Sequence, residues 1–228
     1  MGKTILILIT LISLFACVEN KNEKQKGNIN NTTKYINEIG VKQKITIGKR
    51  IERLKDIFYR HKNTNDKKKQ NQLIDSFFCF FPDNFPLFVE IYGYKEISTD
   101  STLYGQLYND SYSHIKLFFK SNDVIEDSLF IKKIIDISIN GFWESDAVAI
   151  FKSEIVDLIS KNNKSFYSVL KNYKVKDIKS FWKFYFNEPH PDNLDLNKIY
   201  KFRQIDQKMF DIIDTSYKQA LKDAHISG

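Results

Sequence analysis

The sequence predicts an all-α fold, in which about seven to nine helices form a single globular domain. Most segments after residue 34 carry apolar residues three and four positions apart, which is the spacing of one face of an α-helix. Aromatic residues that can form a core are plentiful, with 19 phenylalanines and 12 tyrosines among 228 residues. A chain of this length can bury one substantial core but is short for two domains.

The first two predicted helices cover residues 35–61 and 67–81, with a turn at 63–66 between them. Pro82 ends the second helix because it lacks a donor N–H and disfavours helix just before itself. The expected buried side chains are Ile47, Ile51, Leu54, Phe58, Leu73, Ile74, Phe77, Phe78 and Phe81. Basic residues on the other faces of the first helix leave two interpretations open, a packing helix with a solvated face or a helix near a membrane.

A short third helix, Phe85–Tyr92, begins through Pro86 and ends at Gly93, which can adopt the left-handed conformation of a C-terminal cap. A polar stretch at 98–106 predicts a loop. The next helix is expected over 107–120, where apolar and aromatic residues return at helical spacing. They are Leu107, Tyr108, Tyr112, Ile115 and Phe119.

The following helix is expected to start at Asp123, with Glu126 three residues later as a pair that resembles a capping box. It stops before Gly141. Its β-branched stretch at 134–139 leaves a strand as the alternative, but the polar interruptions and the total length favour a helix.

Ser145 is the expected N-cap of the next helix, and Asp146 in the first turn suits the helix dipole. The apolar face of this helix is Ala147, Val148, Phe151, Ile155, Leu158 and Ile159. The pair Asn162–Asn163 is expected to break it, and another helix follows over 165–173.

The segment Val175–Phe186 is the most aromatic of the chain and predicts a buried helix near the centre of the domain. Trp182 leaves a second interpretation open, in which its indole lines a groove. Two prolines then enforce a turn over 187–192. A last helix is expected from 194 to about 224, with an apolar face made of Ile199, Phe202, Ile205, Met209, Ile212, Ile213 and Ala220.

The first 16 residues predict a signal peptide rather than a part of the fold. Lys3 precedes an apolar run over 5–15, and the sequence turns polar after residue 17. A charged start, a short apolar core and a small residue before the break are typical of a secretory signal. The run is shorter than the stretch of about 20 apolar residues that a spanning helix needs.

The end of this run, Leu14-Phe15-Ala16-Cys17, resembles the lipobox of bacterial lipoproteins. The resemblance implies cleavage before Cys17 and acylation of that cysteine, which makes membrane lipid a partner of the chain. Several acyl chains anchor a protein stably, whereas one binds marginally. By the same resemblance, the lack of an aspartate after Cys17 favours the outer membrane, facing the periplasm. An ordinary secretory signal with an incidental cysteine is the alternative.

Residues 17–33 are mostly Asn, Lys, Glu and Gln, and they predict a disordered tether because they cannot bury enough surface to order themselves. The expected organisation is therefore a signal over 1–16, this tether over 17–33 and a helical domain over 34–228.

The net charge of +7 is unevenly distributed. Residues 17–76 hold fifteen Lys and Arg against seven Asp and Glu, whereas residues 77–228 hold nineteen against twenty-one. The basic excess thus lies near the expected anchor, where it could contact anionic lipid headgroups. A nearly neutral folded body argues against nucleic acid as a partner.

The chain carries few groups that suit metals or cofactors. With Cys17 acylated, Cys79 is a lone thiol in an apolar run and is expected to be a small buried hydrophobe. The four histidines are scattered, without metal-ligand spacing, and no glycine-rich phosphate loop is present. We therefore expect no metal, no cofactor and no disulfide within the chain.

Two groups of polar residues are the candidate functional sites. One lies on the proline-rich turn and the other opens the helix after Gly141; together they are Glu188, His190, Asp192, Trp143, Glu144 and Asp146. If the groups meet in space, they provide paired carboxylates beside an imidazole, which suits acid–base catalysis. The alternatives are a polar turn with a helix cap, or a patch that binds a protein partner.

The sequence thus favours a membrane-anchored lipoprotein without catalytic activity that binds a protein in the cell envelope. In size, anchor and slightly acidic body it is similar to immunity-type lipoproteins, which implies a toxin as the partner. An envelope hydrolase that uses Glu188 and His190 is one alternative, and a structural lipoprotein of outer-membrane assembly is another.

Overall fold

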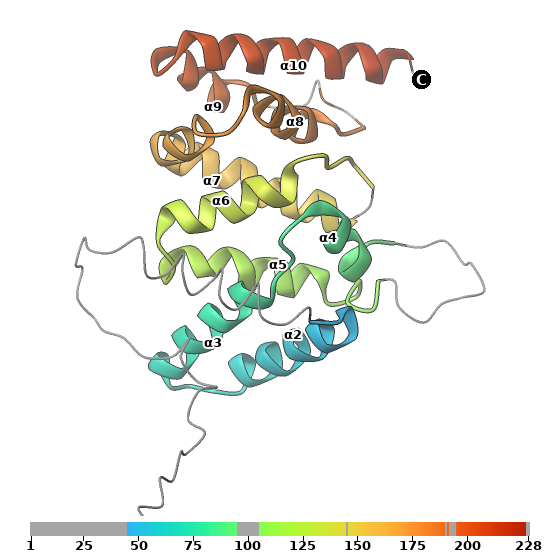
Figure 1. The fold of residues 1–228 in the computed structure, drawn as a ribbon, viewed down its shortest axis with the longest axis vertical. Helices are drawn as coiled ribbons and strands as arrows, with labels where there is room; N and C mark the ends of the chain where they lie inside the picture. The colour runs from blue at the N-terminus through green and yellow to red at the C-terminus, as the bar shows by residue number, and fades with distance from the viewer. Residues whose placement is uncertain (1–44, 95–104, 145, 190, 192–194, 227–228) are drawn as a thin grey trace, which may run out of the picture. The chain divides into compact units, whose positions relative to one another are not determined.

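Figure 1 shows the computed structural model, which describes residues 45–94, 105–144, 146–189, 191 and 195–226. They belong to one compact unit, Ile45–Gly228. The predicted signal, Cys17, the tether and the start of the first predicted helix lie outside the described residues. The described α-helices are α2 (Ile47–Lys62), α3 (Lys67–Phe80), α4 (Phe85–Tyr92), α5 (Ser111–Lys120), α6 (Asp127–Ser138), α7 (Asp146–Leu170), α8 (Val175–Phe186), α9 (Asn197–Tyr200) and α10 (Gln207–Ile226). The described part contains no strand, so the all-α prediction is confirmed.

Side-chain caps define the starts of the first three helices. Thr46 accepts a hydrogen bond from the N–H of Lys49 at 3.4 Å to begin α2. Asp66 accepts from the second and third residues of α3, and Asn84 accepts from Leu87 in α4. These caps satisfy N–H groups that have no partner inside the helix, which explains why the predicted starts of α3 and α4 are correct. The first helix was predicted over 35–61, but residues 45–46 are not helical and α2 begins at Ile47, after the Thr46 cap.

The predicted left-handed cap at Gly93 is wrong. Gly93 has φ −67° and ψ 161°, which is extended backbone. A side chain there would collide with the carbonyl of Val89, so close approach explains the glycine. The glycine with positive φ is Gly105, at 66°, whose N–H donates to the carbonyl of Glu90 at 3.1 Å.

Two predicted helix starts are too early. α5 begins at Ser111 rather than at 107, because residues 105–110 form turns, and Tyr112 is exposed instead of buried. α6 begins at Asp127, since Asp123 belongs to the short 3-10 helix η1 (Ser121–Asp123). The side chain of Glu126 makes no capping bond to the backbone, so the capping-box prediction is also wrong.

α7 is one run with a kink where two helices were predicted. Asn162 has φ −127° and ψ 39°, which interrupts the helix without ending it. The whole predicted apolar face of the first part is buried. The expected N-cap, Ser145, lies outside the described residues. On α3, Cys79 is half-buried rather than fully buried, because Phe77 and Phe78 take the core-facing positions.

The long C-terminal helix predicted from 194 is divided. α9 and the 3-10 helix η3 (Lys201–Gln204) come first, and Asp206 then accepts from Lys208 N–H at 2.8 Å and Met209 N–H at 3.2 Å to start α10. Asp206 is therefore a cap, which the apolar periodicity alone does not reveal.

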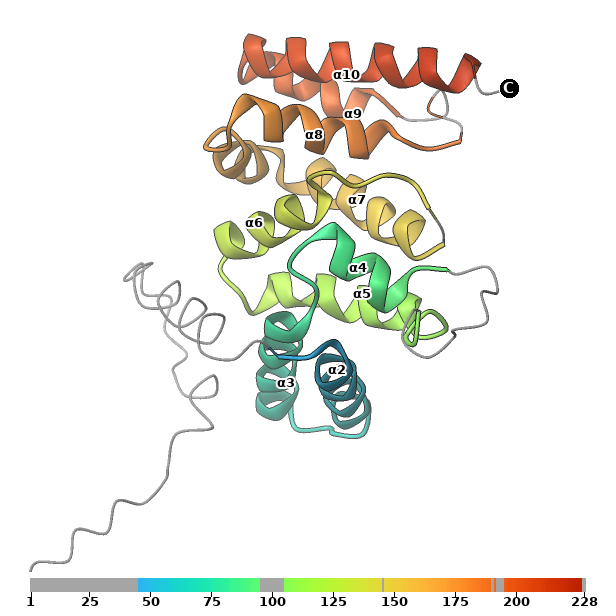
Figure 2. The same cartoon turned by 45° about the vertical axis from the view of Figure 1, so that its right-hand side comes forward.

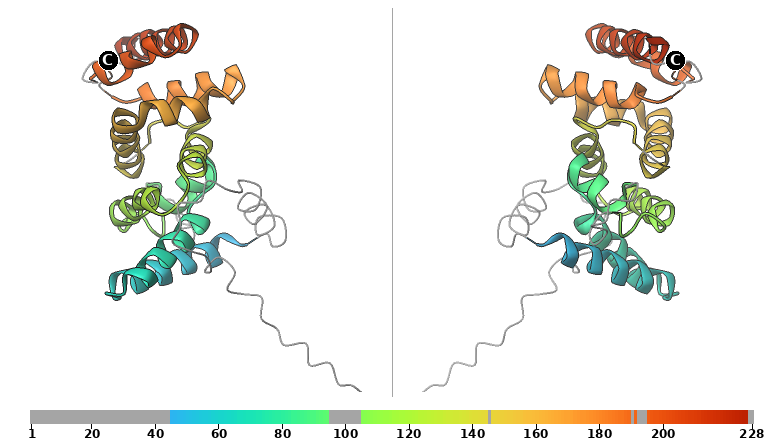
Figure 3. Two further views of the ribbon diagram at one scale, coloured as in Figure 1. Left: turned by 90° about the vertical axis from the view of Figure 1, so that its left-hand side faces the viewer. Right: turned by 90° about the vertical axis from the view of Figure 1, so that its right-hand side faces the viewer.

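Within the unit the helices follow one another from the α2–α3 pair to α10, except that α4 lies beyond α5, next to α6 (Figure 1, Figure 2). α3 packs on α5, α5 on α7, and α8 on α6 and α10 (Figure 3). α8 is buried as predicted but lies near the C-terminal end of this order, not at the centre. Trp182 is fully buried 5.6 Å from the Phe202 ring, so it belongs to the core rather than to a groove.

Candidate functional site

The two predicted groups of site residues meet at Asn187, the residue after α8. The side-chain oxygen of Asn187 accepts from the backbone N–H of Trp143 at 2.5 Å. Its backbone carbonyl accepts from the Nζ of Lys152, on α7, at 2.6 Å. Its own N–H donates back into α8. Asn187 therefore joins the end of α8 to α7 and to the loop that precedes α7.

Lys152 is the buried charge of this junction. Its side chain is only 6% exposed, and the nearest carboxylate oxygen, Oε2 of Glu188, is 3.9 Å from Nζ. The Phe184 ring lies 5.7 Å from the same nitrogen. Burial lowers the pKa of Lys152 to about 8, and Glu188 opposes this shift.

The loop before α7 is held against aromatic side chains. A Cβ on Gly141 would lie 2.5 Å from a carbon of the Phe184 ring and 3.0 Å from one of Phe85, so only glycine fits. The next two residues, Phe142 and Trp143, are 53% and 42% exposed. Their backbone is thus fixed while their rings face solvent.

A groove of about 840 Å³ lies beside this loop. α8 and α10 pack against each other (Figure 2). Residues of both helices line the groove. Trp143 and Glu188 both line it, together with apolar atoms of Phe186, Ile212 and Ala220. Besides Glu188, the charged lining comes from Lys179 and Lys183 on α8 and from Asp211 and Asp223 on α10.

The other candidate residues do not join this groove. Asp146 accepts a hydrogen bond from the Tyr108 hydroxyl at 2.9 Å, which raises the pKa of Tyr108. Glu144 does not line the groove, and its Oε1 lies near Gly93. His190 and Asp192 lie outside the described residues. The Asp146 carboxylate therefore faces Tyr108 and not Glu188.

Lys152 and Asn187 are the site residues that sequence reasoning missed. Lys152 lies four positions after Val148 and three before Ile155, on the apolar face of its helix. A lysine on an apolar helix face could have identified this site from the sequence, because buried lysines are rare unless they are paired. Asn187 had no comparable signal, since its role depends on three segments that are distant in sequence.

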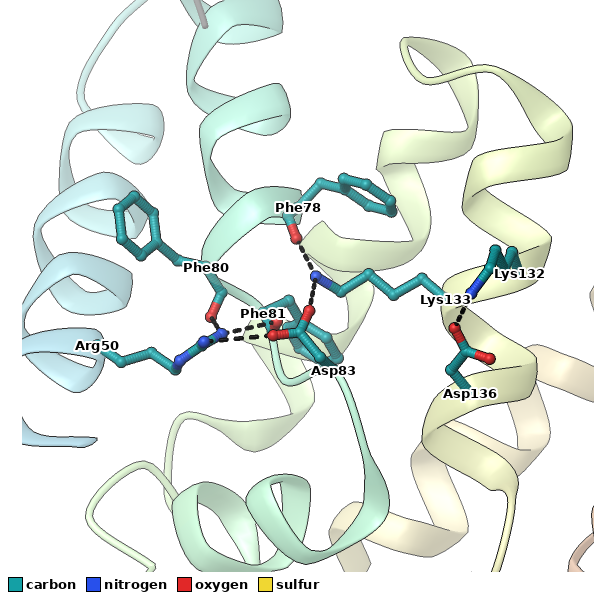
Figure 4. A network of polar contacts seen from close by, with 8 residues as sticks. All are labelled: Arg50, Phe78, Phe80, Phe81, Asp83, Lys132, Lys133 and Asp136. Atoms are coloured by element: carbon teal, nitrogen blue, oxygen red, sulfur yellow. Dashed lines mark hydrogen bonds and ion pairs between the residues drawn. The ribbon is translucent and has the colours of Figure 1, made fainter. Parts of the chain in front are cut away.

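A second polar cluster, partly buried, lies between α2, α3 and α6 (Figure 4). Arg50 donates to the carbonyls of Phe80 and Phe81 at 3.0 and 3.2 Å, and Lys133 donates to that of Phe78 at 2.6 Å. Asp83 accepts from both cations, at 3.2 and 2.8 Å (Figure 4). These contacts satisfy the carbonyls at the end of α3, so the cluster is structural.

One histidine is buried without a charged role. His114 is 1% exposed, with its Nδ1 3.2 Å from the Tyr92 hydroxyl and its ring against Phe58 and Phe77. Burial lowers the pKa of His114 to about 4, so it is neutral at physiological pH. Within the described ranges, no three His, Cys, Asp or Glu side chains gather as a metal site.

No protein-family model matches the chain, and neither a curated protein nor a solved structure matches it. Among the described helices, none is both long and apolar enough to cross a bilayer.

Proposed function

We propose that this chain is a lipoprotein, anchored at Cys17 in the outer membrane, that binds a protein partner in the cell envelope. The proposal joins the lipobox-like segment, which supplies the anchor, to the groove between α8 and α10, which supplies the binding surface. It requires neither a cofactor nor a catalytic group.

The main support for the binding surface is the exposed side chain of Trp143. Its indole is 42% exposed beside the groove, although its backbone is fixed by Asn187. Tryptophan is enriched among the residues that contribute most to protein interfaces. A fixed backbone lowers the entropy lost on binding. Trp143 is thus placed to act as an anchor for an incoming side chain.

The charges around the groove favour a partner segment of mixed charge. Lys179 and Lys183 line it from α8, and Asp211 and Asp223 line it from α10. Opposite charges on opposite walls orient a partner more than they strengthen its binding. The occupant we propose is a protein segment with one large apolar side chain between acidic and basic neighbours.

The similarity in type to immunity lipoproteins makes a toxin of the cell envelope the proposed partner. The hydrolase alternative gains no support from the described contacts. Glu188 is placed beside Lys152 rather than beside a second carboxylate from the α7 start. A structural lipoprotein of outer-membrane assembly, the other alternative, would use the same groove but bind a different protein partner.

Two experiments test the lipid anchor and the binding surface separately. Mass spectrometry of the mature N-terminus should find an acylated Cys17, and Cys17→Ser should release the protein from membranes. An intact Met1 or an unmodified Cys17 would overturn the anchor.

Affinity capture from envelope extract should recover one stoichiometric protein partner. Trp143→Ala should weaken capture at least tenfold, as expected for an interface anchor. Tyr112→Ala is the matched control, because Tyr112 is 60% exposed on α5 and does not line the groove. Equal capture by wild type and Trp143→Ala would contradict the proposed surface.

A further inference from the structure

The turn between α2 and α3 carries a dense group of positive charges. Residues 60–69 contain five Lys and Arg but a single acidic residue, Asp66. They lie in the last turn of α2 and the first turn of α3, and all five are exposed. We call this group the basic tip; it consists of Arg60, Lys62, Lys67, Lys68 and Lys69.

Little of this charge is neutralised within the described part of the chain. Arg60 pairs with Asp56 at 3.3 Å, and Lys69 lies 4.0 Å from Asp66. Lys67, Lys68 and Lys69 all stand at the start of α3, where the helix dipole is positive and favours acidic residues. The arrangement is thus unfavourable for the isolated domain, which is typical of a surface used for binding.

A third helix adds to the same positive surface. Lys120 is the last residue of α5. Burial lowers the pKa of His61, and the charges of Lys120 and Lys67 lower it further. Both lysines are therefore close enough to His61 to act on it. Tyr59, three residues before Lys62 on α2, is 68% exposed.

We propose that the basic tip, with Tyr59 beside it, is a docking surface for the anionic headgroups of a lipid bilayer. Lysine and arginine clusters bind anionic lipid surfaces, and tyrosine is enriched at the membrane interface. The proposal rests in part on the proposed function, because the anchor at Cys17 precedes α2 in the sequence and would bring the domain to a membrane. Residues 77–228 carry a slight negative excess, so the positive charge that would attract a bilayer lies in residues 17–76, to which the basic tip belongs.

Vesicle sedimentation tests the surface without the anchor. The probe protein is the chain from Val18 to Gly228, which keeps the whole described unit and omits the signal and Cys17. It should bind vesicles that contain phosphatidylglycerol and not vesicles of phosphatidylcholine alone, and added salt should weaken the binding. The triple variant K67Q/K68Q/K69Q should lower the partition coefficient on the order of 100-fold, since each charge near the surface contributes about fivefold.

The matched control is K201Q/K208Q/K222Q, which removes the same charge from exposed positions of η3 and α10. It should bind anionic vesicles nearly as well as wild type. Equal loss in both triple variants would overturn the proposal, because the attraction would then follow net charge alone. Binding to heparin without binding to the vesicles would also overturn it, by assigning the tip to another polyanion. Failure of the vesicle test would leave acylation of Cys17 unaffected, so the two proposals fail separately.

Discussion

Lys133 on α6 and Lys152 on α7 each donate to a carbonyl at the end of another helix, but their charges are compensated differently. The side chain of Lys133 is partly buried, at 10% exposed, and that of Lys152 is buried, at 6%. Lys133 donates to the carbonyl of Phe78 at the end of α3, and Asp83 lies 2.8 Å from the same nitrogen (Figure 4). Lys152 donates to the carbonyl of Asn187 after α8, but its closest acidic neighbour is 3.9 Å away. Lys133 thus has a close counter-charge, whereas Lys152 has one hydrogen bond to a carbonyl and a more distant carboxylate.

The difference in charge compensation separates the contacts at the end of α3, which serve structure alone, from those at the end of α8. Removing a charge from water is costly unless hydrogen bonds and a close counter-charge offset the cost. Around Asp83 a carboxylate is shared by two cations, and the end of α3 is closed. Around Lys152 the compensation is smaller, and the junction borders the groove that Trp143 lines. The less compensated junction is therefore the one beside the proposed binding surface.

The largest effect that we predict is a rise in stability with pH caused by Lys152. Its pKa is about 8 in the folded chain, against an ordinary value of 10.5. Between these values the unfolded chain binds more protons, so the free energy of unfolding rises with pH, by on the order of 2 to 3 kcal/mol. Below pH 8 both states are protonated and the contribution is constant. Lys152→Met should remove this contribution, so the free energy of unfolding of wild type minus that of the variant, from denaturant unfolding, should rise from pH 7.5 to 10.5. Lys133, whose pKa burial also lowers, contributes equally to both chains.

The quantity to compare is the difference between wild type and variant at each pH. Burial raises the pKa of Tyr185, so the folded chain keeps a proton there that the unfolded chain loses, and stability falls above pH 10 in every variant. Subtracting the free energy of unfolding of the variant from that of wild type removes this contribution of Tyr185. Lys164→Met, at an exposed position of α7, should show no pH trend. If the difference between wild type and Lys152→Met also does not change with pH, burial does not lower the pKa of Lys152 and the prediction is wrong.

The second prediction concerns the shared carboxylate. Asp83→Asn keeps the shape of the side chain but leaves the buried charges of Arg50 and Lys133, which are 16% and 10% exposed, without a counter-charge. We expect a loss of about 2 kcal/mol in the free energy of unfolding, below the full cost of breaking a buried pair because Asp83 is itself half exposed. Urea unfolding at pH 7 measures it. A loss under about 0.5 kcal/mol would contradict the role assigned to Asp83.

Helical faces could be predicted from the sequence, because burial of one face leaves a local and periodic signal. The buried faces of α3 and of the first part of α7 follow from it directly. The starts of α5, α6 and α10 could not be predicted this way. Apolar residues continue through the turns before α5, and the cap Asp206 interrupts an apolar pattern that shows no break.

The third prediction uses two adjacent lysines of α6. Lys133→Met keeps the apolar stem but removes the donor to the Phe78 carbonyl and the cation beside the Phe78 ring. An unsatisfied buried carbonyl costs about 1 to 2 kcal/mol. Lys132→Met removes only an exposed pair with Asp136 at 2.5 Å, so it should cost less than about 0.5 kcal/mol. Thermal or urea unfolding compares the two, and equal effects would refute the distinction between them.

The candidate site was less predictable than the fold. Trp143 and Glu188 were named from the sequence because aromatic and acidic residues stood out on loops. Their meeting through Asn187 depends on contacts across 35 and 44 positions of the chain, and no local pattern encodes such contacts. Asp146 was placed correctly in a first helical turn but faces Tyr108 instead of the groove.

The smallest expected effect is that of Glu188→Gln, the counterpart of Asp83→Asn at the second junction. Glu188 is 26% exposed and 3.9 Å from Nζ of Lys152, so loss of this ion pair should cost less than about 0.5 kcal/mol at pH 7. It should also move the pH-dependent rise to lower pH, because Glu188 is the charge that opposes the lowered pKa of Lys152. Urea unfolding over the same pH range measures both effects. A loss as large as that of Asp83→Asn would show that the two junctions are equally paired, and the distance between the charges would then not explain the contrast.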